Sequence, residues 1–194
     1  MITFAVAILA VGSQKITREI PNASWEPIFF GDPSDRQSIN GRARLSDLPP
    51  LREKPLPKGH VEVRFWQGFG ITYLEGFRLR FDGGKWRAWK LEPAIPGRAD
   101  LKHKKFLTEL RPPSMGWPGF LKELESDGIY TLPDFDSLPG RKAEIVDGLC
   151  YVVEFQKAAK YRTYCYDNPT LQPRTWKEVD SMIRIAMLFR KAFP

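Results

Sequence analysis

Hydrophobic and polar residues alternate along the middle of the chain with the period of a β-strand. In residues 61–66, VEVRFW, the side chains of Val61, Val63 and Phe65 fall on one side, which predicts a half-buried strand. Residues 75–93, EGFRLRFDGGKWRAWKLEP, show the same alternation on both sides of an Asp-Gly-Gly sequence at 82–84. Because glycine adopts the positive φ angles that tight turns need, this segment predicts a β-hairpin.

One face of this hairpin is a candidate binding surface. If Phe81 pairs with Trp86, then Leu79 meets Ala88 on the core face. The opposite face then carries Arg78, Arg80, Arg87 and Trp89. Three cations beside an indole suit an acidic ligand, and they also allow cation–π contact. The alternative interpretation is a solvated sheet face that long side chains cover.

Residues 149–169, LCYVVEFQKAAKYRTYCYDNP, predict a second hairpin that contains both cysteines. We expect strands at 149–155 and 160–166 with a turn at 156–159. A register that pairs Glu154 with Tyr161 puts Cys150 opposite Cys165. A disulfide between them would close a loop of about 15 residues and add roughly 3 kcal/mol to stability. If the register is shifted by two residues, the two cysteines are ordinary buried thiols. A third interpretation is a redox site, but no nearby residue obviously lowers the pKa of either thiol.

The other face of the second hairpin is rich in tyrosine. Its residues are Tyr151, Arg162, Tyr164 and Tyr166, together with smaller apolar neighbours. Amphipathic rings around an arginine are typical of a surface that binds a partner protein. Alternatively, these rings form an edge of the core beneath the C-terminal helix.

Two segments in the middle of the chain have helical character. Residues 99–113, ADLKHKKFLTELRPP, form a loose apolar stripe that ends at two prolines. Residues 116–128, GWPGFLKELESDG, have Pro118 near a helix start and Gly128 as a stop.

The strongest helical pattern lies at the C-terminus. Residues 175–193, TWKEVDSMIRIAMLFRKAF, carry an apolar stripe at helical spacing, and Thr175 with Glu178 predicts a capping box. Such a stripe is typical of a helix that packs on a sheet. The chain therefore predicts an α+β fold, an antiparallel β-sheet built from hairpins with a C-terminal amphipathic helix packed on one face.

Length and proline content indicate the domain organisation. The 194 residues suffice for one domain with its own core, and many of the 17 prolines lie outside the patterned segments. We expect a single α+β domain at 61–194 and an irregular, proline-rich arm at 15–60. The residues that would anchor this arm to the core are Trp25, Ile28, Phe29 and Phe30. Residues 1–14, MITFAVAILAVGSQ, are either a signal-like segment or a buried first strand, and their apolar run is too short to span a bilayer.

Charge and motifs favour binding over catalysis. The net charge is +7, but Lys and Arg are spread along the chain without a nucleic-acid-binding motif, so we do not expect a nucleic-acid partner. With two histidines and no Cys-x-x-Cys sequence, we expect neither a metal nor a cofactor. We interpret Asp134 and Asp136 as turn formers, and Glu62, Glu75 and Glu154 as solvent-facing strand residues.

Two blocks resemble known sequences: VRFWQGFGITYLEGFRLRFDGGKW at 63–86 and DGLCYVVEFQKAAKYRTYCYDNP at 147–169. They resemble segments of bacterial exported proteins of unknown function, in which a tyrosine-rich strand ends in a Tyr-Asp-Asn-Pro turn and a final helix follows. The resemblance covers roughly half the chain and brings no catalytic residues. It implies export from a Gram-negative cell, so we expect a periplasmic or secreted location, with the cytoplasm as the alternative.

We therefore expect a non-enzymatic envelope protein that binds another protein, as an inhibitor or immunity factor does, and that has no transmembrane span. A second hypothesis is a binder of an anionic ligand or polymer through the basic and aromatic face of the first hairpin. A third is a hydrolase with dispersed carboxylates, which would require a deep acidic cleft.

Overall fold

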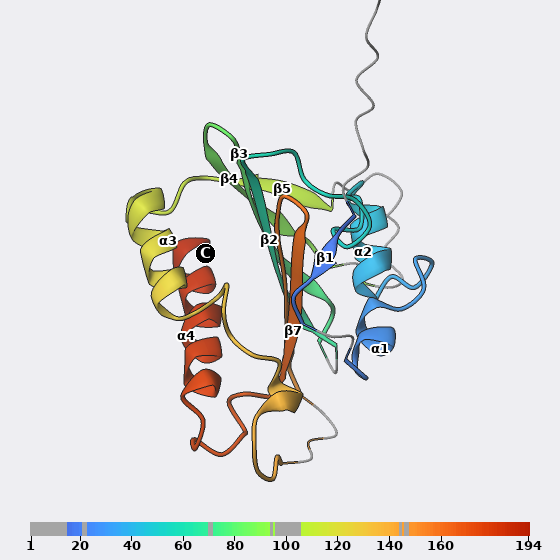
Figure 1. The fold of residues 1–194 in the computed structure, drawn as a ribbon, viewed down its shortest axis with the longest axis vertical. Helices are drawn as coiled ribbons and strands as arrows, with labels where there is room; N and C mark the ends of the chain where they lie inside the picture. Colours follow the sequence, from blue (N-terminus) through green and yellow to red (C-terminus); the bar gives the residue numbers. More distant parts are fainter. Residues whose placement is uncertain are drawn as a thin grey trace, which may run out of the picture.

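The computed structural model describes residues 15–20, 23–69, 72–93, 95, 106–143, 145 and 148–194. A mostly antiparallel sheet forms the middle layer, with α3 and α4 over one face and α1 and α2 over the other (Figure 1). The strands are β1 (Thr17–Arg18), β2 (His60–Gly68), β3 (Glu75–Asp82), β4 (Trp86–Leu91), β5 (Leu107–Leu110), β6 (Cys150–Lys157) and β7 (Lys160–Asp167). The helices are α1 (Glu26–Phe30), α2 (Ile39–Leu45), α3 (Gly116–Ser126), the 3₁₀ turn η2 (Phe135–Ser137) and α4 (Lys177–Ala192). The predicted α+β class is confirmed.

The sheet has the strand order β1-β7-β6-β2-β3-β4-β5. The central strand β2 pairs antiparallel with β3 on one side and with β6 on the other, so it joins the two predicted hairpins. The first hairpin has the expected register, because Phe81 pairs with Trp86 and Leu79 with Ala88. The short β1 pairs in parallel with β7, whereas the other strand pairs in the described part of the chain are antiparallel.

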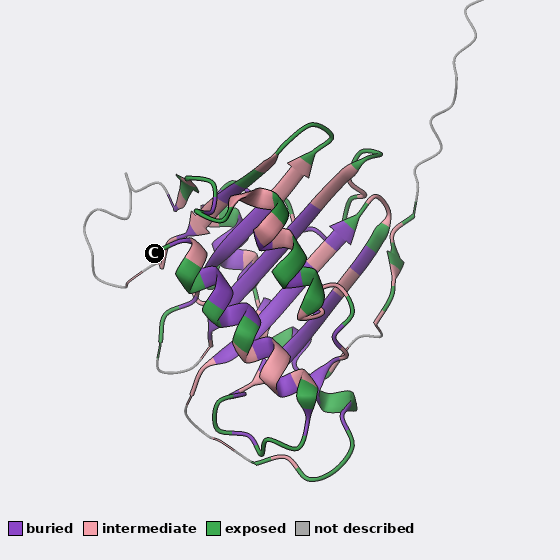
Figure 2. Ribbon diagram, turned by 90° about the vertical axis from the view of Figure 1, so that its left-hand side faces the viewer, coloured by how far each residue is buried: buried purple, intermediate pink, exposed green. Residues whose placement is uncertain are grey.

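The face of the sheet beneath α3 and α4 holds the larger apolar core. Helix α4 turns a buried stripe toward the strands and leaves its other side exposed (Figure 2). The ring of Phe189 lies 4.7 Å from that of Phe65 and 5.2 Å from that of Phe77, measured between centroids. Helix α3 adds Phe120 and Leu124, both fully buried. The predicted packing of the C-terminal helix on the sheet is confirmed.

The opposite face of the sheet is also covered. Trp25 and Phe30 of the arm are buried there against sheet residues that include Trp66 and Val152. Strand β2 is therefore buried on both faces, and the prediction of a half-buried strand was wrong on this point. Of the expected anchors, Ile28 is 74% exposed and does not reach the core.

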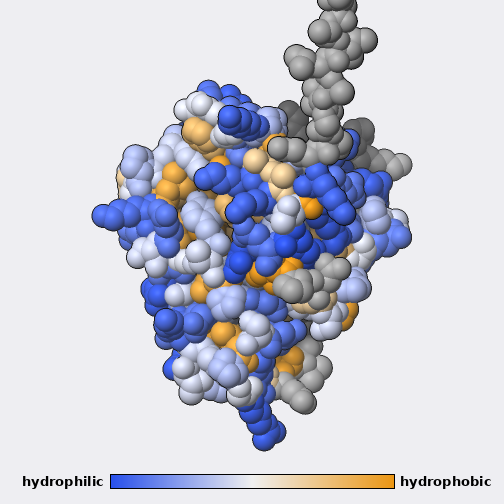
Figure 3. Space-filling model, in the orientation of Figure 1, coloured by the Kyte–Doolittle hydropathy of each residue, from blue (hydrophilic) through white to orange (hydrophobic). Residues whose placement is uncertain are grey.

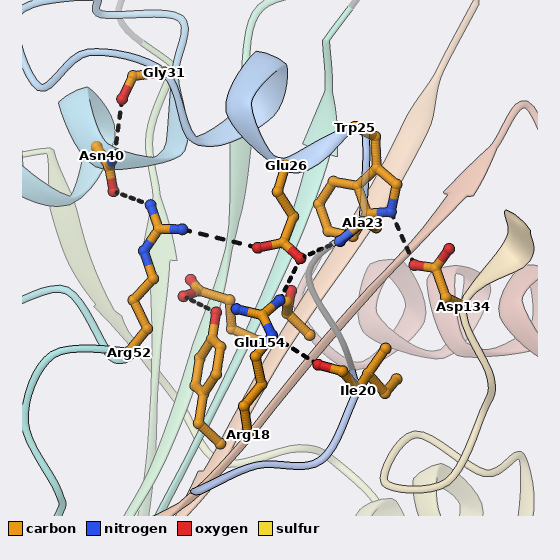
Figure 4. A network of polar contacts seen from close by, with 12 residues as sticks. Arg18, Ile20, Ala23, Trp25, Glu26, Gly31, Asn40, Arg52, Asp134 and Glu154 are labelled. Carbon is orange, nitrogen blue, oxygen red and sulfur yellow. Dashed lines mark hydrogen bonds and ion pairs between the residues drawn. The ribbon is translucent and has the colours of Figure 1, made fainter. Parts of the chain in front are cut away.

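A polar network holds the arm in place (Figure 4). The buried carboxylate of Glu26 lies between the guanidinium groups of Arg18 and Arg52, and it also accepts a hydrogen bond of 2.9 Å from the backbone N–H of Ala23. Arg52 in turn donates to the side-chain oxygen of Asn40, 3.3 Å away. Because Glu26 is taken out of water, these partners are needed to offset its desolvation.

Three local predictions were wrong. The arm is not irregular throughout, since Ser38 caps α2 by accepting a hydrogen bond from the backbone N–H of Gly41. Residues 107–110, expected in a helix, form β5, because Leu107 and Leu110 pair with Leu91 and Ala88 at the free edge of β4. Helix α4 starts after Trp176 without a side-chain cap, so the capping box of Thr175 and Glu178 does not form.

Among the described residues, none of the helices is both long and apolar enough to cross a membrane. The segment at 1–14, for which we expected a signal or a first strand, lies outside the described residues.

Candidate functional site

The residues of the predicted basic face of the first hairpin lie together as expected, but carboxylates of the protein itself already contact its arginines. Arg78 pairs with Trp89, and its guanidinium lies 4.8 Å from the centre of that indole. Both Arg78 and Arg80 contact the carboxylate of Glu62, at 2.9 and 3.3 Å. Exposed Arg87 lies 3.9 Å from Glu109. The cations of this face therefore already have anionic partners inside the protein.

Glu62 is the centre of a buried polar layer that the sequence did not indicate. Its side chain is 1% exposed, and it also accepts a hydrogen bond of 2.8 Å from Arg64. Burial by itself raises the pKa of Glu62, but the charges and hydrogen bonds of Arg64 and Arg78 outweigh burial and leave the pKa below its ordinary value. The prediction of a solvent-facing strand glutamate was wrong here.

Glu154 occupies an equivalent buried position on β6. It accepts hydrogen bonds from the indole N–H of Trp66 at 2.9 Å and from the hydroxyl of Tyr161 at 3.1 Å. Its prediction as a solvent-facing residue was therefore also wrong. Glu62 and Glu154 each have structural partners, and neither lines the cavity described below.

The tyrosines of the second hairpin lie inside the larger core rather than on a partner-binding surface. Tyr151, Tyr164 and Tyr166 are at most 3% exposed. Tyr164 donates a hydrogen bond of 2.6 Å to the carbonyl of Ile129, and Arg162 donates to the carbonyls of Thr131 and Leu132. The three tyrosines therefore occupy the position given by the second interpretation, an edge of the core beneath the helices. Their rings are not accessible to a partner protein.

The second hairpin has a different register from the one that places its cysteines opposite each other. Gln156 pairs with Tyr161, so Cys150 faces Asp167 and Cys165 faces Val152. The shift of two residues arises because the turn has two residues, with Ala158 at φ 51°, instead of the four expected. The two thiols lie on one face as diagonal neighbours, and both are free, so the predicted disulfide is not formed.

Both thiols line a cavity of about 330 Å³ at one end of the sheet. It is lined by four aromatic residues, three acidic residues and five others, namely Trp25, Phe29, Phe69, Phe135, Asp134, Asp136, Asp167, Ile145, Gly148, Cys150, Cys165 and Asn168. This volume lies within the range of small-molecule and side-chain pockets. Five separate segments build the cavity, namely the arm, the end of β2, η2, the loop before β6 and the end of the second hairpin.

Asp134 fixes one wall of the cavity. One of its oxygens, Oδ2, accepts hydrogen bonds from the indole N–H of Trp25 at 2.9 Å and from the backbone N–H of Cys165 at 3.1 Å. The other oxygen accepts from the backbone N–H of Asp136 at 3.0 Å. Burial raises the pKa of Asp134 above its ordinary value, and these hydrogen bonds act in the opposite direction. Figure 4 shows the carboxylate directed at the indole.

The thiols of the cavity are not poised for reaction. Burial, together with the hydrogen bond of 2.8 Å that Cys150 donates to Asp167, raises the pKa of the Cys150 thiol to about 12. Burial also raises the pKa of Cys165 well above its ordinary value. Since the thiolate is the nucleophile, both groups are inert near neutral pH.

Sequence reasoning placed both cysteines on one face and noted Asp134 and Asp136, but it treated these aspartates only as turn formers. Their additional role in the wall of the cavity depends on contacts between segments more than one hundred residues apart, such as Trp25 and Asp134. Hydrophilic residues dominate the view in Figure 3, where hydrophobic residues appear as scattered patches.

Comparisons of the chain with protein-family models, with curated proteins and with solved structures found no match. Among the described residues, there is also no group of three His, Cys, Asp or Glu side chains that could hold a metal ion.

Proposed function

We propose that this protein binds another protein and uses the cavity to hold a side chain of that partner. The observation that carries the proposal is the cavity of about 330 Å³, with its aromatic walls and fixed hydrogen-bonding groups. Pockets that accept an anchoring side chain at the centre of a protein interface have this character.

Exposed apolar residues near the cavity support a protein as the partner. Ile28, Tyr73 and Leu171 are 74%, 44% and 61% exposed. Ile28 directly precedes Phe29, and the N–H of Leu171 donates to the carbonyl of Asn168, so both adjoin residues that line the cavity. The backbone carbonyl of Tyr73 lies close to Gly68 at the end of β2. Apolar side chains in such positions can extend the contact beyond a single bound group.

The groups in the cavity are better suited to binding than to catalysis. A hydrolase could use Asp134 as a general acid, since its pKa is raised. However, both oxygens of Asp134 already accept hydrogen bonds from fixed N–H groups, and such donors favour the carboxylate over the acid. The two thiols have raised pKa values and are poor nucleophiles. The proposal of an anionic ligand on the first hairpin has less support, because Glu62 and Glu109 contact its arginines.

The resemblance to exported proteins supports the envelope as the place where the partner is met, and an inhibitor or immunity factor remains the proposed class. Affinity capture from an envelope extract, followed by mass spectrometry, tests the proposal. Immobilised wild-type protein is compared with Phe69→Ala, which removes a ring that lies 4.4 Å from Phe29, and with Met187→Ala, an exposed change on α4.

We expect one protein to be retained by the wild type and by Met187→Ala, and to be lost with Phe69→Ala. Calorimetry with that purified protein then measures the direct affinity. Equal retention by all three proteins would contradict a role of the cavity in binding.

A further inference from the structure

The charge of the cavity is opposite to the charge of the whole chain. The chain has 30 Lys and Arg against 23 Asp and Glu, for a net charge of +7. In contrast, the described residues that line the cavity include Asp134, Asp136 and Asp167 and none of Lys, Arg or His. Because a cavity with low-dielectric walls concentrates the field of its charges, these carboxylates favour a cation in the cavity even though the protein as a whole is basic.

Two of the three carboxylates have free acceptor capacity. Asp167 accepts hydrogen bonds on Oδ1 from Cys150 and from the amide of Asn168, both at 2.8 Å, while its Oδ2 has no partner among the described residues. The side chain of Asp136 is exposed and likewise has no partner in the described part of the chain. Both groups can therefore accept hydrogen bonds from a cationic donor.

The aromatic walls suit the same kind of ligand. The ring of Phe29 lies 5.8 Å from that of Trp25 and 4.4 Å from that of Phe69, so three π-systems are grouped on one wall. Aromatic faces attract cations, and groups of such rings recognise alkylammonium ligands.

The protein already holds one ammonium at the edge of this site. The Nζ atom of Lys142 lies 5.3 Å from the centre of the Phe135 ring, and it donates to the backbone carbonyls of Asp136 and Leu138 at 3.4 and 2.8 Å. This lysine uses carbonyl groups and leaves the side-chain oxygens of Asp136 for another donor. The contact shows that a cation over an aromatic face is compatible with the local structure.

We infer that the cavity recognises the ammonium or guanidinium group of a lysine or arginine side chain that a partner protein presents. The inference rests on the proposed function and specifies the chemistry of the bound group. The apolar stem of such a side chain would contact the aromatic wall, and its cationic end would be bound by Asp136 and Asp167.

The indole N–H of Trp25 provides a direct readout, because it lies in the cavity wall and donates to Asp134. Titrations followed by ¹H–¹⁵N NMR use Nα-acetyl-lysine methylamide and Nα-acetyl-arginine methylamide as probes. The corresponding norleucine and citrulline derivatives serve as neutral controls, and n-butylammonium represents a free amine. A Trp25→Phe variant assigns the indole signal.

We expect the two cationic probes to shift the Trp25 indole signal in a saturable and salt-sensitive way, with little effect of the neutral controls. A variant with both Asp136→Asn and Asp167→Asn should raise the Kd by roughly tenfold or more. The matched control is Asp47→Asn, an exposed change outside the cavity, which should leave the Kd unchanged.

The possible failures are distinguishable. Equal binding of neutral and cationic probes, or no shift of the Trp25 signal with any probe, would overturn cation recognition. In either case, partner capture that depends on Phe69 would still support the proposed function. Binding of n-butylammonium as tight as that of the amino-acid probes would overturn the assignment to a partner's side chain. Cation binding without Phe69-dependent capture would contradict the proposed function alone.

Discussion

The indole N–H of Trp25 donates a hydrogen bond of 2.9 Å to the carboxylate of Asp134, which lies 109 residues further along the chain. Asp134 also accepts from the backbone N–H of Cys165 at the outer edge of β7. One carboxylate therefore connects the arm, the η2 turn and the sheet. These three segments are also walls of the cavity, so the stability of the fold and the shape of the site depend on the same contact.

We predict that Trp25→Phe lowers the free energy of unfolding by about 2 kcal/mol. A phenyl ring replaces the larger indole, so some packing is lost, and Asp134 also loses one of its hydrogen bonds. Hydrogen bonds to charged groups contribute about 1.5–3 kcal/mol. Chemical denaturation measures the difference. Trp86→Phe is the control, since the indole N–H of Trp86 has no hydrogen-bond partner among the described residues. An equal loss of stability in both variants would show that the contact with Asp134 is not important.

The buried cluster around Glu62 predicts a pH-dependent contribution to stability. The pKa of Glu62 in the folded protein lies below its ordinary value of 4.5, so the folded state binds the proton less tightly than the unfolded state. The stabilisation is therefore fully present above pH 4.5 and is lost as the pH falls through the folded pKa. Asp134 acts in the opposite direction, because its raised pKa favours the protonated folded state as the pH falls.

The variant Glu62→Gln separates the two groups. At neutral pH, it should be less stable than the wild type by about 3 kcal/mol, because buried arginines lose their charged partner. The difference should shrink as the pH is lowered below 4.5, which urea unfolding at several pH values can measure. A difference that stays constant down to the lowest pH at which the protein folds would contradict this role of Glu62.

Cys150 and Cys165 should both be found as thiols that react slowly. They are buried, they are diagonal rather than directly opposed, and their pKa values are raised. We expect the intact mass to be the same with and without reductant, and thiol labelling of the folded protein to be slow at neutral pH. Labelling in guanidinium chloride should be fast and complete. A mass lower by the two hydrogens of a disulfide would show that the hairpin adopts the other register.

Sequence reasoning was most successful where local chemistry determines the structure. The register of β3 and β4 was correct because two glycines fix the position of the turn between two alternating segments. The second hairpin has a pair of alanines at its turn, and Ala158 adopts a positive φ that this residue type rarely takes. A two-residue turn at that point could not be read from residue types, so the cysteines were placed in the wrong pairs.

The remaining errors have a common cause in long-range burial. Glu62 and Arg64 look like solvent-facing residues in an alternating strand, yet the arm covers them and they form ion pairs there. Residues 107–110 have no strand signal of their own and become β5 through pairing with β4. The cavity is assembled from five segments, so its cysteines and aspartates could be noted individually but not recognised as one site.

The two fully buried arginines give the last prediction. Arg64 donates to Glu62 and to the carbonyl of Pro49, whereas the three side-chain nitrogens of Arg42 have no hydrogen-bond partner in the described part of the chain. Arg42 lies 4.9 Å from the centre of the Phe106 ring. Burial lowers its pKa to about 10 and the charge of Glu92 acts in the opposite direction, so Arg42 remains charged near neutral pH. Removing a buried charge that has no hydrogen-bond partner removes its desolvation cost, while removing one member of a hydrogen-bonded buried pair leaves the other uncompensated.

We therefore expect Arg42→Met to leave the free energy of unfolding unchanged or to raise it, and Arg64→Met to lower it by about 3 kcal/mol. The two variants replace equally buried side chains with the same apolar residue, so each is the matched control of the other in chemical denaturation. A loss with Arg42→Met as large as that with Arg64→Met would show that the attraction of Arg42 to Glu92 and to the Phe106 ring outweighs its desolvation cost. Its charge would then stabilise the packing of α2 on the sheet rather than oppose it.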